Sequence, residues 1–242
     1  MKNPFVHARV PGENRSSVLV KQATLLLALQ LLGGGVRAES LPDAQQVLAN
    51  VRLRQSTQQL DLPGQLRQES ALIPFRLVQN GPVIRYIFTN PDETLLLRLG
   101  ENDSRLKEIT RSGSTNMTRG KLDDAVRGTA ITYEDLAFGF LYWPNARVVG
   151  SDFLRTRSCW KLQLQSPSNE SQYGRMDLWV DKEGGALMRM EGFDRSGKLK
   201  RRFEVVSAQK IDDRWFLKQM RVEMKDPGNG AVTRRTYLEI KK

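Results

Sequence analysis

Histidine and cysteine are nearly absent from this chain of 242 residues, which contains one of each. A single cysteine cannot form an intrachain disulfide, and it excludes zinc sites built from several cysteines. The only histidine, His7, lies in a segment that we expect to be removed. The mature chain would then hold no Ser–His or Cys–His nucleophile pair and no histidine-ligated metal. The sequence therefore predicts neither a metal ion nor a cofactor.

Long apolar runs are also missing, apart from one near the N-terminus at residues 23–32. Lys21 precedes this run, three glycines follow it, and Val36 and Ala38 supply the small side chains of a signal-peptidase site. A transmembrane anchor would need about 20 apolar residues. We therefore expect residues 1–38 to be a cleaved signal peptide and residues 39–242 to form a single domain in the periplasm.

Acidic residues are fewer than basic ones, 27 against 38, and the formal net charge is +11. The predicted signal peptide holds five basic residues and one acid, so the mature chain would carry +7. The basic side chains are spread along the chain, mostly one per predicted strand, which argues against a nucleic-acid partner. Anionic lipid headgroups or an acidic protein partner fit this distribution better.

An amphipathic helix is predicted at the start of the mature chain, over residues 41–60, with Ser40 as a candidate N-cap. Its apolar side chains recur at helical spacing, at Leu41, Ala44, Val47, Leu48 and Val51. A helix with a single apolar stripe has to pack on another element.

The rest of the chain has the pattern of antiparallel β-structure, because short apolar runs alternate with turn signals about every ten residues. The first predicted strands are 66–72, 75–78 after a break at Pro74, 83–89, 94–99 and 105–109. Residues 111–128 are predicted to be a loop. A meander of five strands follows, at 175–182, 186–193, 199–210, 215–225 and 232–241.

The register of the meander can be predicted from its turns. A three-residue loop at residues 183–185 pairs Val180 with Met188, Leu178 with Met190, and Met176 with Gly192. A four-residue turn at 194–197 then pairs Phe203 with Met188 and Val205 with Ala186. Alternation adds Phe216, Met220, Val222, Met224, Leu238 and Ile240 to the same face. Five of the seven methionines lie on this predicted apolar face.

This face has two interpretations, a packed core beneath the helix or a ligand cavity. Methionine is flexible and polarizable, and surfaces that accept varied apolar partners are rich in it. Residues 132–143 are unusually apolar and begin with capping-box spacing at Thr132 and Asp135, so this segment is the candidate lid. The predicted acyl-binding residues of cavity and lid are Met176, Leu178, Met188, Met190, Phe203, Val205, Met220, Met224, Phe138, Leu141 and Trp143.

The order of several short motifs resembles that of the LolA-like outer membrane lipoprotein-sorting proteins. These motifs are PF at 74–75, IRYIF at 84–88, ITYEDL at 131–136, Tyr173, LWVDK at 178–182, RME at 189–191, FD at 193–194, GK at 197–198 and TYL at 236–238. The resemblance implies a mainly β (α+β) fold, an incomplete antiparallel β-barrel closed by the N-terminal helix and the short central lid. It also implies a monomeric, non-enzymatic carrier of lipoprotein or lipid acyl chains, with an inner-membrane donor and an outer-membrane acceptor.

Two other functions stay open. A sensor of the same fold would bind lipid or lipoprotein without transporting it. A hydrolase would need paired carboxylates, for which the candidates are Glu134 with Asp135 and Asp177 with Asp181. We expect the first pair to cap a helix and the second to be solvated on the outer face. Cys159 is expected to be a small strand residue, with a reactive thiol as the alternative because its neighbours are basic.

Overall fold

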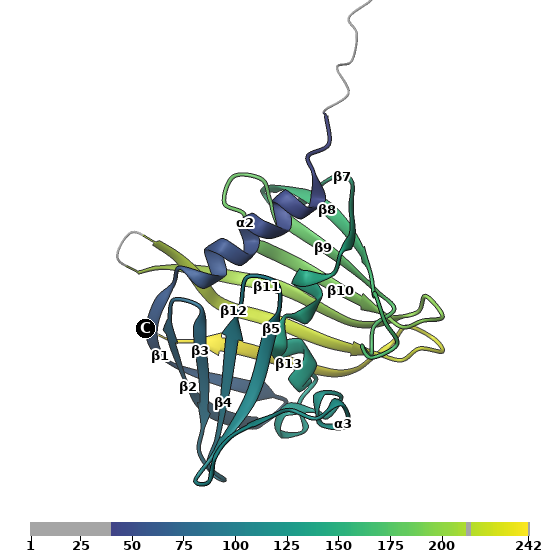
Figure 1. The fold of residues 1–242 in the computed structure, drawn as a ribbon. Helices are drawn as coiled ribbons and strands as arrows, with labels where there is room; N and C mark the ends of the chain where they lie inside the picture. Colours follow the sequence, from purple (N-terminus) through teal and green to yellow (C-terminus); the bar gives the residue numbers. More distant parts are fainter. Residues whose placement is uncertain (1–39, 212–213, 242) are drawn as a thin grey trace, which may run out of the picture. The chain divides into compact units, whose positions relative to one another are not determined.

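Antiparallel strands dominate the computed structural model, which describes residues 40–211 and 214–241 (Figure 1). The predicted signal peptide and its cleavage site lie outside the described residues. The strands are β1 (Gln59–Gln68), β2 (Ala71–Asn80), β3 (Val83–Phe88), β4 (Glu93–Leu99), β5 (Ser104–Thr110), β6 (Gly113–Asn116), β7 (Asn145–Leu154), β8 (Arg157–Gln165), β9 (Arg175–Asp181), β10 (Leu187–Phe193), β11 (Leu199–Ile211), β12 (Arg214–Lys225) and β13 (Val232–Ile240).

All thirteen described strands belong to one sheet, in the order β6-β5-β4-β3-β2-β1-β13-β12-β11-β10-β9-β8-β7. The pairing of β1 with β13 joins the two halves of the chain. No ladder in the described part of the chain joins β6 to β7, so the sheet stays open. The predicted fold class, an incomplete antiparallel barrel with few helices, is confirmed.

The N-terminal helix is shorter than predicted. Helix α2 spans Ala44–Ser56, and its N-cap is Asp43, whose carboxylate accepts a hydrogen bond from the Gln46 backbone N–H at 2.8 Å. The predicted cap at Ser40 is therefore wrong, and Leu41 is 52% exposed. The predicted stripe is otherwise confirmed, because Ala44, Val47, Leu48 and Val51 are buried. In Figure 1, α2 runs across a face of the sheet towards the start of β1.

Prolines do not end the first strands, which corrects the prediction for residues 66–78. Pro63 lies inside β1 and Pro74 inside β2, and the turn between these strands is at Glu69, where φ is +53°. Pro63 lies one residue before β1 begins to pair with β13, at Gly64. Pro74 likewise lies one residue before β2 begins to pair with β3, at Phe75. The missing N–H therefore costs no hydrogen bond there.

The five-strand meander is confirmed as β9–β13, and its register is partly confirmed. Leu178 pairs with Met190 and Met176 with Gly192, as predicted. Phe203 pairs with Met190 instead of Met188, because the turn takes one more residue and β11 contains a bulge near Gly192. The predicted pairing of Val205 with Ala186 is wrong for the same reason, and Val205 instead pairs with Met220 of β12.

The central segment is not one helix. Helix α4 (Tyr133–Ala137) has the predicted capping box, formed by Thr132 and Asp135. It ends at Phe138, whose φ of +54° breaks the helix before the 3-10 turn η2 (Gly139–Tyr142). The predicted loop before it contains β6, the short helix α3 (Arg119–Leu122) and the 3-10 turn η1 (Val126–Gly128).

Candidate apolar binding face

The main apolar cluster lies on the side of the sheet that carries α2 and the central segment, which we call the inner face. Alternate residues of every long strand point into it, as the period of two requires. Leu48 and Val51 of α2 and Leu141 of η2 pack into the same cluster, and each is at most 1% exposed. The sheet, α2 and the central segment therefore share one core.

Most of the predicted acyl-binding residues come together on this face. Six are buried in the cluster, namely Met176, Leu178, Met190, Phe203, Leu141 and Trp143. Three more, Phe138, Met220 and Met224, are half-buried and pack against it. Val205 is half-buried too, and it faces Met220 across the β11–β12 ladder.

Met188 is the exception, because the prediction that it lies on the apolar face is wrong. Leu187 takes the place opposite Val180, and a bulge before Arg189 turns Met188 to the other side of the sheet. There it packs against a small outer cluster of Leu154, Cys159 and Trp179. Cys159 is fully buried, and burial raises the pKa of its thiol to about 11, which argues against the alternative of a reactive thiol.

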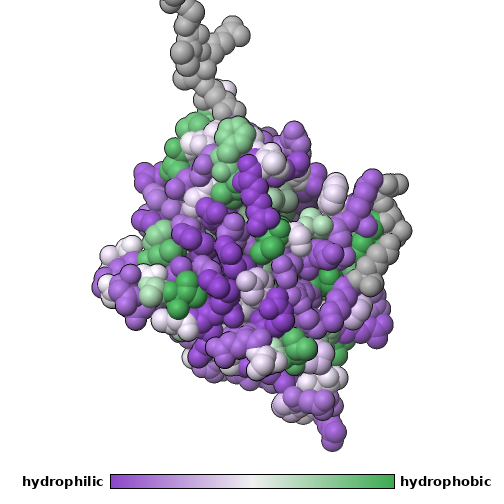
Figure 2. Space-filling view, turned by 180° about the vertical axis from the view of Figure 1, so that it is seen from behind, coloured by the Kyte–Doolittle hydropathy of each residue, from purple (hydrophilic) through white to green (hydrophobic). Residues whose placement is uncertain are grey.

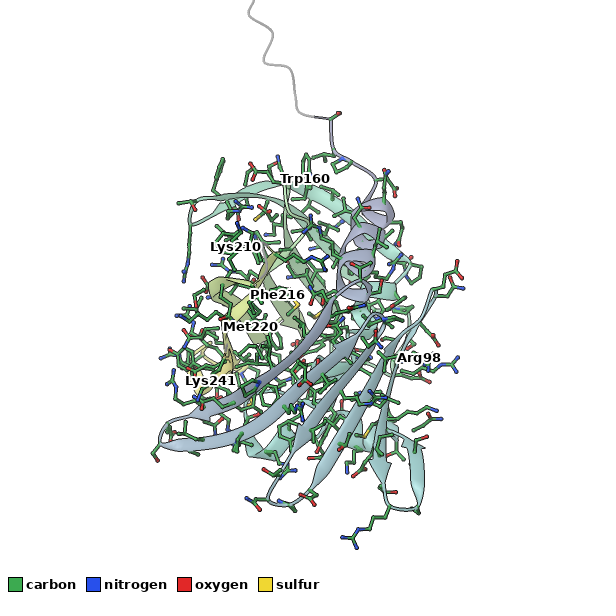
Figure 3. The ribbon with its side chains drawn as sticks, turned by 90° about the vertical axis from the view of Figure 1, so that its left-hand side faces the viewer. Arg98, Trp160, Lys210, Phe216, Met220 and Lys241 are labelled. Atoms are coloured by element: carbon green, nitrogen blue, oxygen red, sulfur yellow. The ribbon has the colours of Figure 1, made fainter. Side chains whose placement is uncertain are left out.

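One part of the inner face that is only half-covered is a row of paired residues that crosses five strands. We call it the half-buried row. Val205, Met220, Leu238, Leu66 and Ile73 face one another in turn on β11, β12, β13, β1 and β2. Leu66 is buried, and the other four are half-buried. Figure 3 shows Met220 and Phe216 on this part of β12.

The sequence analysis missed the residues that β1 and β2 contribute to this row. Leu66 and Ile73 lie on strands whose boundaries were mispredicted, and the row exists only because β1 pairs with β13. The alternation of Leu62, Gly64 and Leu66 is the one local signal for β1. At Gly64 a side chain would collide with the ring of Phe75, because an added Cβ would lie 2.6 Å from Phe75 Cζ.

A buried polar cluster anchors the start of the central segment to the sheet. Arg201 of β11 donates to the Tyr173 hydroxyl at 2.8 Å and lies 3.3 Å from a carboxylate oxygen of Asp135. Tyr173 in turn donates to Asp135 at 2.6 Å. The side chains of Arg201 and Asp135 are only 5% and 3% exposed. Burial and the adjacent Asp135 carboxylate hold the pKa of Tyr173 well above its usual value.

The far end of the central segment is tied to α2. Arg52 donates to the carbonyl of Leu141 at 2.6 Å, and Gln45 donates to the carbonyl of Trp143 at 3.1 Å. Side chains of α2 thus bond to backbone carbonyls of η2 and of the residue that follows it. The two elements therefore cover the inner face as a linked pair.

The carboxylates of the pairs considered for hydrolysis all have hydrogen-bond or ion-pair partners within the fold. Asp135 closes the capping box, and Glu134 accepts a hydrogen bond from the Gln172 backbone N–H at 3.1 Å. Asp177 and Asp181 are buried, so the expectation that they are solvated is wrong. Asp177 lies 3.1 Å from Arg175, and Asp181 is held by Arg157 at 2.8 Å.

Two surface hollows, of about 320 and 440 Å³, are lined mainly by polar residues. Neither includes a residue of the predicted acyl site. Six residues of that site are buried in the main apolar cluster, beneath α2 and the central segment. Among the described helices, none has the length and apolar composition needed to cross a bilayer.

Solved structures with a similar fold include proteins from three bacteria. An outer membrane lipoprotein-sorting protein domain from Vibrio parahaemolyticus matches with a TM-score of 0.64 at 15% identity, covering 82% of this chain and 90% of that one. A DUF1329 family protein from Desulfovibrio piger gives 0.61 at 16% identity, covering 83% and 92%. A LolA superfamily protein from Nitrosomonas europaea gives 0.58 at 12% identity, covering 83% and 93%.

These likenesses define the chain as a protein of LolA-like fold, which confirms the resemblance inferred from its motifs. A family model described as "Uncharacterized protein" matches residues 109–242, more than half of the chain, and the chain belongs to that family. No curated protein sequence matches the chain.

Proposed function

We propose that this chain is a non-enzymatic periplasmic protein that binds the acyl chains of lipoproteins or other lipids on its inner face. It would carry them between an inner-membrane donor and an outer-membrane acceptor after export with residues 1–38 as a cleaved signal peptide. The observation that supports this most is the half-buried row, an apolar surface crossing five strands that α2 and the central segment do not fully cover.

The energetics suit reversible binding. Each acyl methylene that leaves water contributes about 0.8 kcal/mol, so a few methylenes on the half-buried row give a weak initial contact. Further methylenes require the linked pair of α2 and η2 to move away from the buried sheet residues Met176, Leu178 and Met190. A carrier has to release its cargo, and a site that opens at a cost keeps the affinity moderate.

The test is binding of a fluorescent fatty-acyl probe to two matched variants. Met220→Glu places a charge on the half-buried row, where the carboxylate can still reach water. Met188→Glu places the same charge on the other side of the sheet at a similar depth. We expect Met220→Glu to weaken probe binding about tenfold, the equivalent of losing about two methylenes, and Met188→Glu to leave it nearly unchanged.

Equal binding by both variants would contradict the proposed site. Mass spectrometry of lipids extracted from the protein purified from the periplasm identifies the cargo. Transfer of a labelled lipoprotein between membrane fractions then separates a carrier from a binder of the same fold, since a binder would retain its ligand and transfer none.

A further inference from the structure

The two halves of the sheet carry their outer charges differently. On β10–β13 each outer acid faces an arginine. Glu204 lies 3.3 Å from Arg189 and 2.7 Å from Arg221, Glu191 lies 2.8 Å from Arg202, and Glu223 lies 2.9 Å from Arg235. Figure 2, seen from behind the view of Figure 1, shows a mostly hydrophilic surface with small separate apolar patches.

On β3–β5 the outer cations face no acid. Arg85 is paired across the strands with Val78 and Leu96, and Lys107 with Leu96 and Asn116. Arg98 is paired with Val83 and Arg105, and Arg105 already binds Asp103 at 2.8 Å. Among the described residues, no ion pair or hydrogen bond engages the side chain of Arg85, Arg98 or Lys107.

These cations surround an aliphatic centre. Leu96 is directly opposite both Arg85 and Lys107, and Arg98 is two residues further along the same strand and the same face. Since neighbouring strands are about 4.8 Å apart, the Cα atoms of the three basic residues lie within about 10 Å of one another. We call the six residues involved the β3–β5 outer patch, namely Arg85, Arg98, Lys107, Val78, Val83 and Leu96.

The β3–β5 outer patch is energetically unfavourable in the isolated protein. Arg98 and Arg105 are like charges directly opposite each other, which destabilises a sheet. Arg85 and Arg98 are exposed, while Val78, Val83 and Leu96 are only half-buried. An anionic surface that also accepts aliphatic side chains would reduce both the repulsion between the cations and the exposure of the aliphatic residues to water. Figure 3 shows Arg98 far from Met220, so this surface is separate from the inner face.

We propose that the β3–β5 outer patch docks the protein on an anionic phospholipid bilayer. The cations would meet lipid phosphates, and the aliphatic side chains would rest among the headgroups. The choice of a bilayer over an acidic protein rests on the proposed function, because a lipid carrier has to reach a membrane to load or deliver its cargo.

The test is co-sedimentation of the purified protein, its N-terminal residue verified by mass spectrometry, with vesicles. One set contains phosphatidylglycerol and phosphatidylcholine, and the other contains phosphatidylcholine alone. We expect binding to the anionic vesicles only, weakened by added salt. The triple variant Arg85→Gln, Arg98→Gln, Lys107→Gln should lower the affinity about 100-fold, roughly fivefold per cation.

The matched control is Lys198→Gln, Arg214→Gln, Lys218→Gln, which removes the same charge from exposed side chains elsewhere. Equal losses in both triple variants would overturn the proposal, because net charge alone would then explain binding. Binding to polyglutamate without binding to anionic vesicles would overturn it in favour of an acidic protein partner. Circular dichroism checks that both variants are folded.

Acyl-probe binding by the same proteins separates this proposal from the proposed function. Vesicle binding that is lost while probe binding persists supports the patch as a docking surface distinct from the lipid site. Wild-type protein that binds anionic vesicles through the patch but binds no acyl probe would contradict the lipid site alone.

Discussion

Replacing Arg201 by methionine tests the buried polar cluster that anchors the central segment. The variant leaves the Asp135 carboxylate buried with the Tyr173 hydroxyl and the Thr132 N–H but without its cation. Removing one partner of a buried pair costs about 3–5 kcal/mol, and for a domain of this size that lowers Tm by about 10 °C. Urea and thermal unfolding followed by circular dichroism measure the loss.

The neighbouring arginine provides the control. Arg202 points to the outer face and pairs with Glu191, and their side chains are 33% and 12% exposed, so Arg202→Met should cost about 1–2 kcal/mol, less than Arg201→Met. Adding Asp135→Asn to Arg201→Met should cost less than the sum of the single variants, because no buried charge is then left unpaired. Similar small losses from Arg201→Met and Arg202→Met would refute the argument that burial makes the first pair indispensable.

Three further outcomes are expected. Gly192→Ala should destabilise the fold by about 2 kcal/mol in urea unfolding, since its Cβ would lie 2.4 Å from Tyr173 Cε1, whereas Gly120→Ala meets nothing within 4 Å and should be neutral. Cys159, whose pKa burial raises to about 11, should resist a thiol reagent at pH 8 until the protein unfolds, and stability should fall as pH rises from about 9 to 11. Burial acts to raise the pKa of Glu223, but hydrogen bonds from Lys225 and Arg235 lower it overall. The stabilising contribution of Glu223 should therefore be complete above about pH 4.5 and lost on acidification. A pH titration of Tm measures this loss, which should be absent from Glu223→Gln.

Local patterns predicted those elements whose ends are marked by turn residues. The meander β9–β13 was found because glycine and aspartate separate its strands, and the apolar stripe of α2 was found from its spacing. Most of β1 was missed, because QLDLPGQLRQ mixes proline, glycine and charge, and Gly64 interrupts the alternation of Leu60, Leu62 and Leu66. Its strand character comes from pairing on both sides, with β2 and with β13, which is a tertiary effect.

The residues of the candidate site were predicted correctly only where the strand register was predicted correctly. Four of the five methionines assigned to the apolar face lie on it, and Met188 does not, because a single bulge reverses the side to which a strand residue points. The half-buried row depends on residues far apart in the chain, such as Leu66 and Leu238. No local pattern carries that information.

The pairing of charged residues also cannot be predicted from local sequence, and here the difference bears on function. Arg85 and Arg202 look alike in the sequence, each a basic residue in an alternating run. Arg202 is neutralised because β10 places Glu191 opposite it, whereas Arg85 meets Val78 and Leu96 from its two neighbouring strands. Whether a strand cation is part of the protein's own ion pairs or is left for a partner is therefore decided by strand order and register. Basic residues that are spread evenly along the sequence are thus ion-paired where acids face arginines on β10–β13, whereas the cations of the β3–β5 outer patch have no ion-pair partner among the described residues.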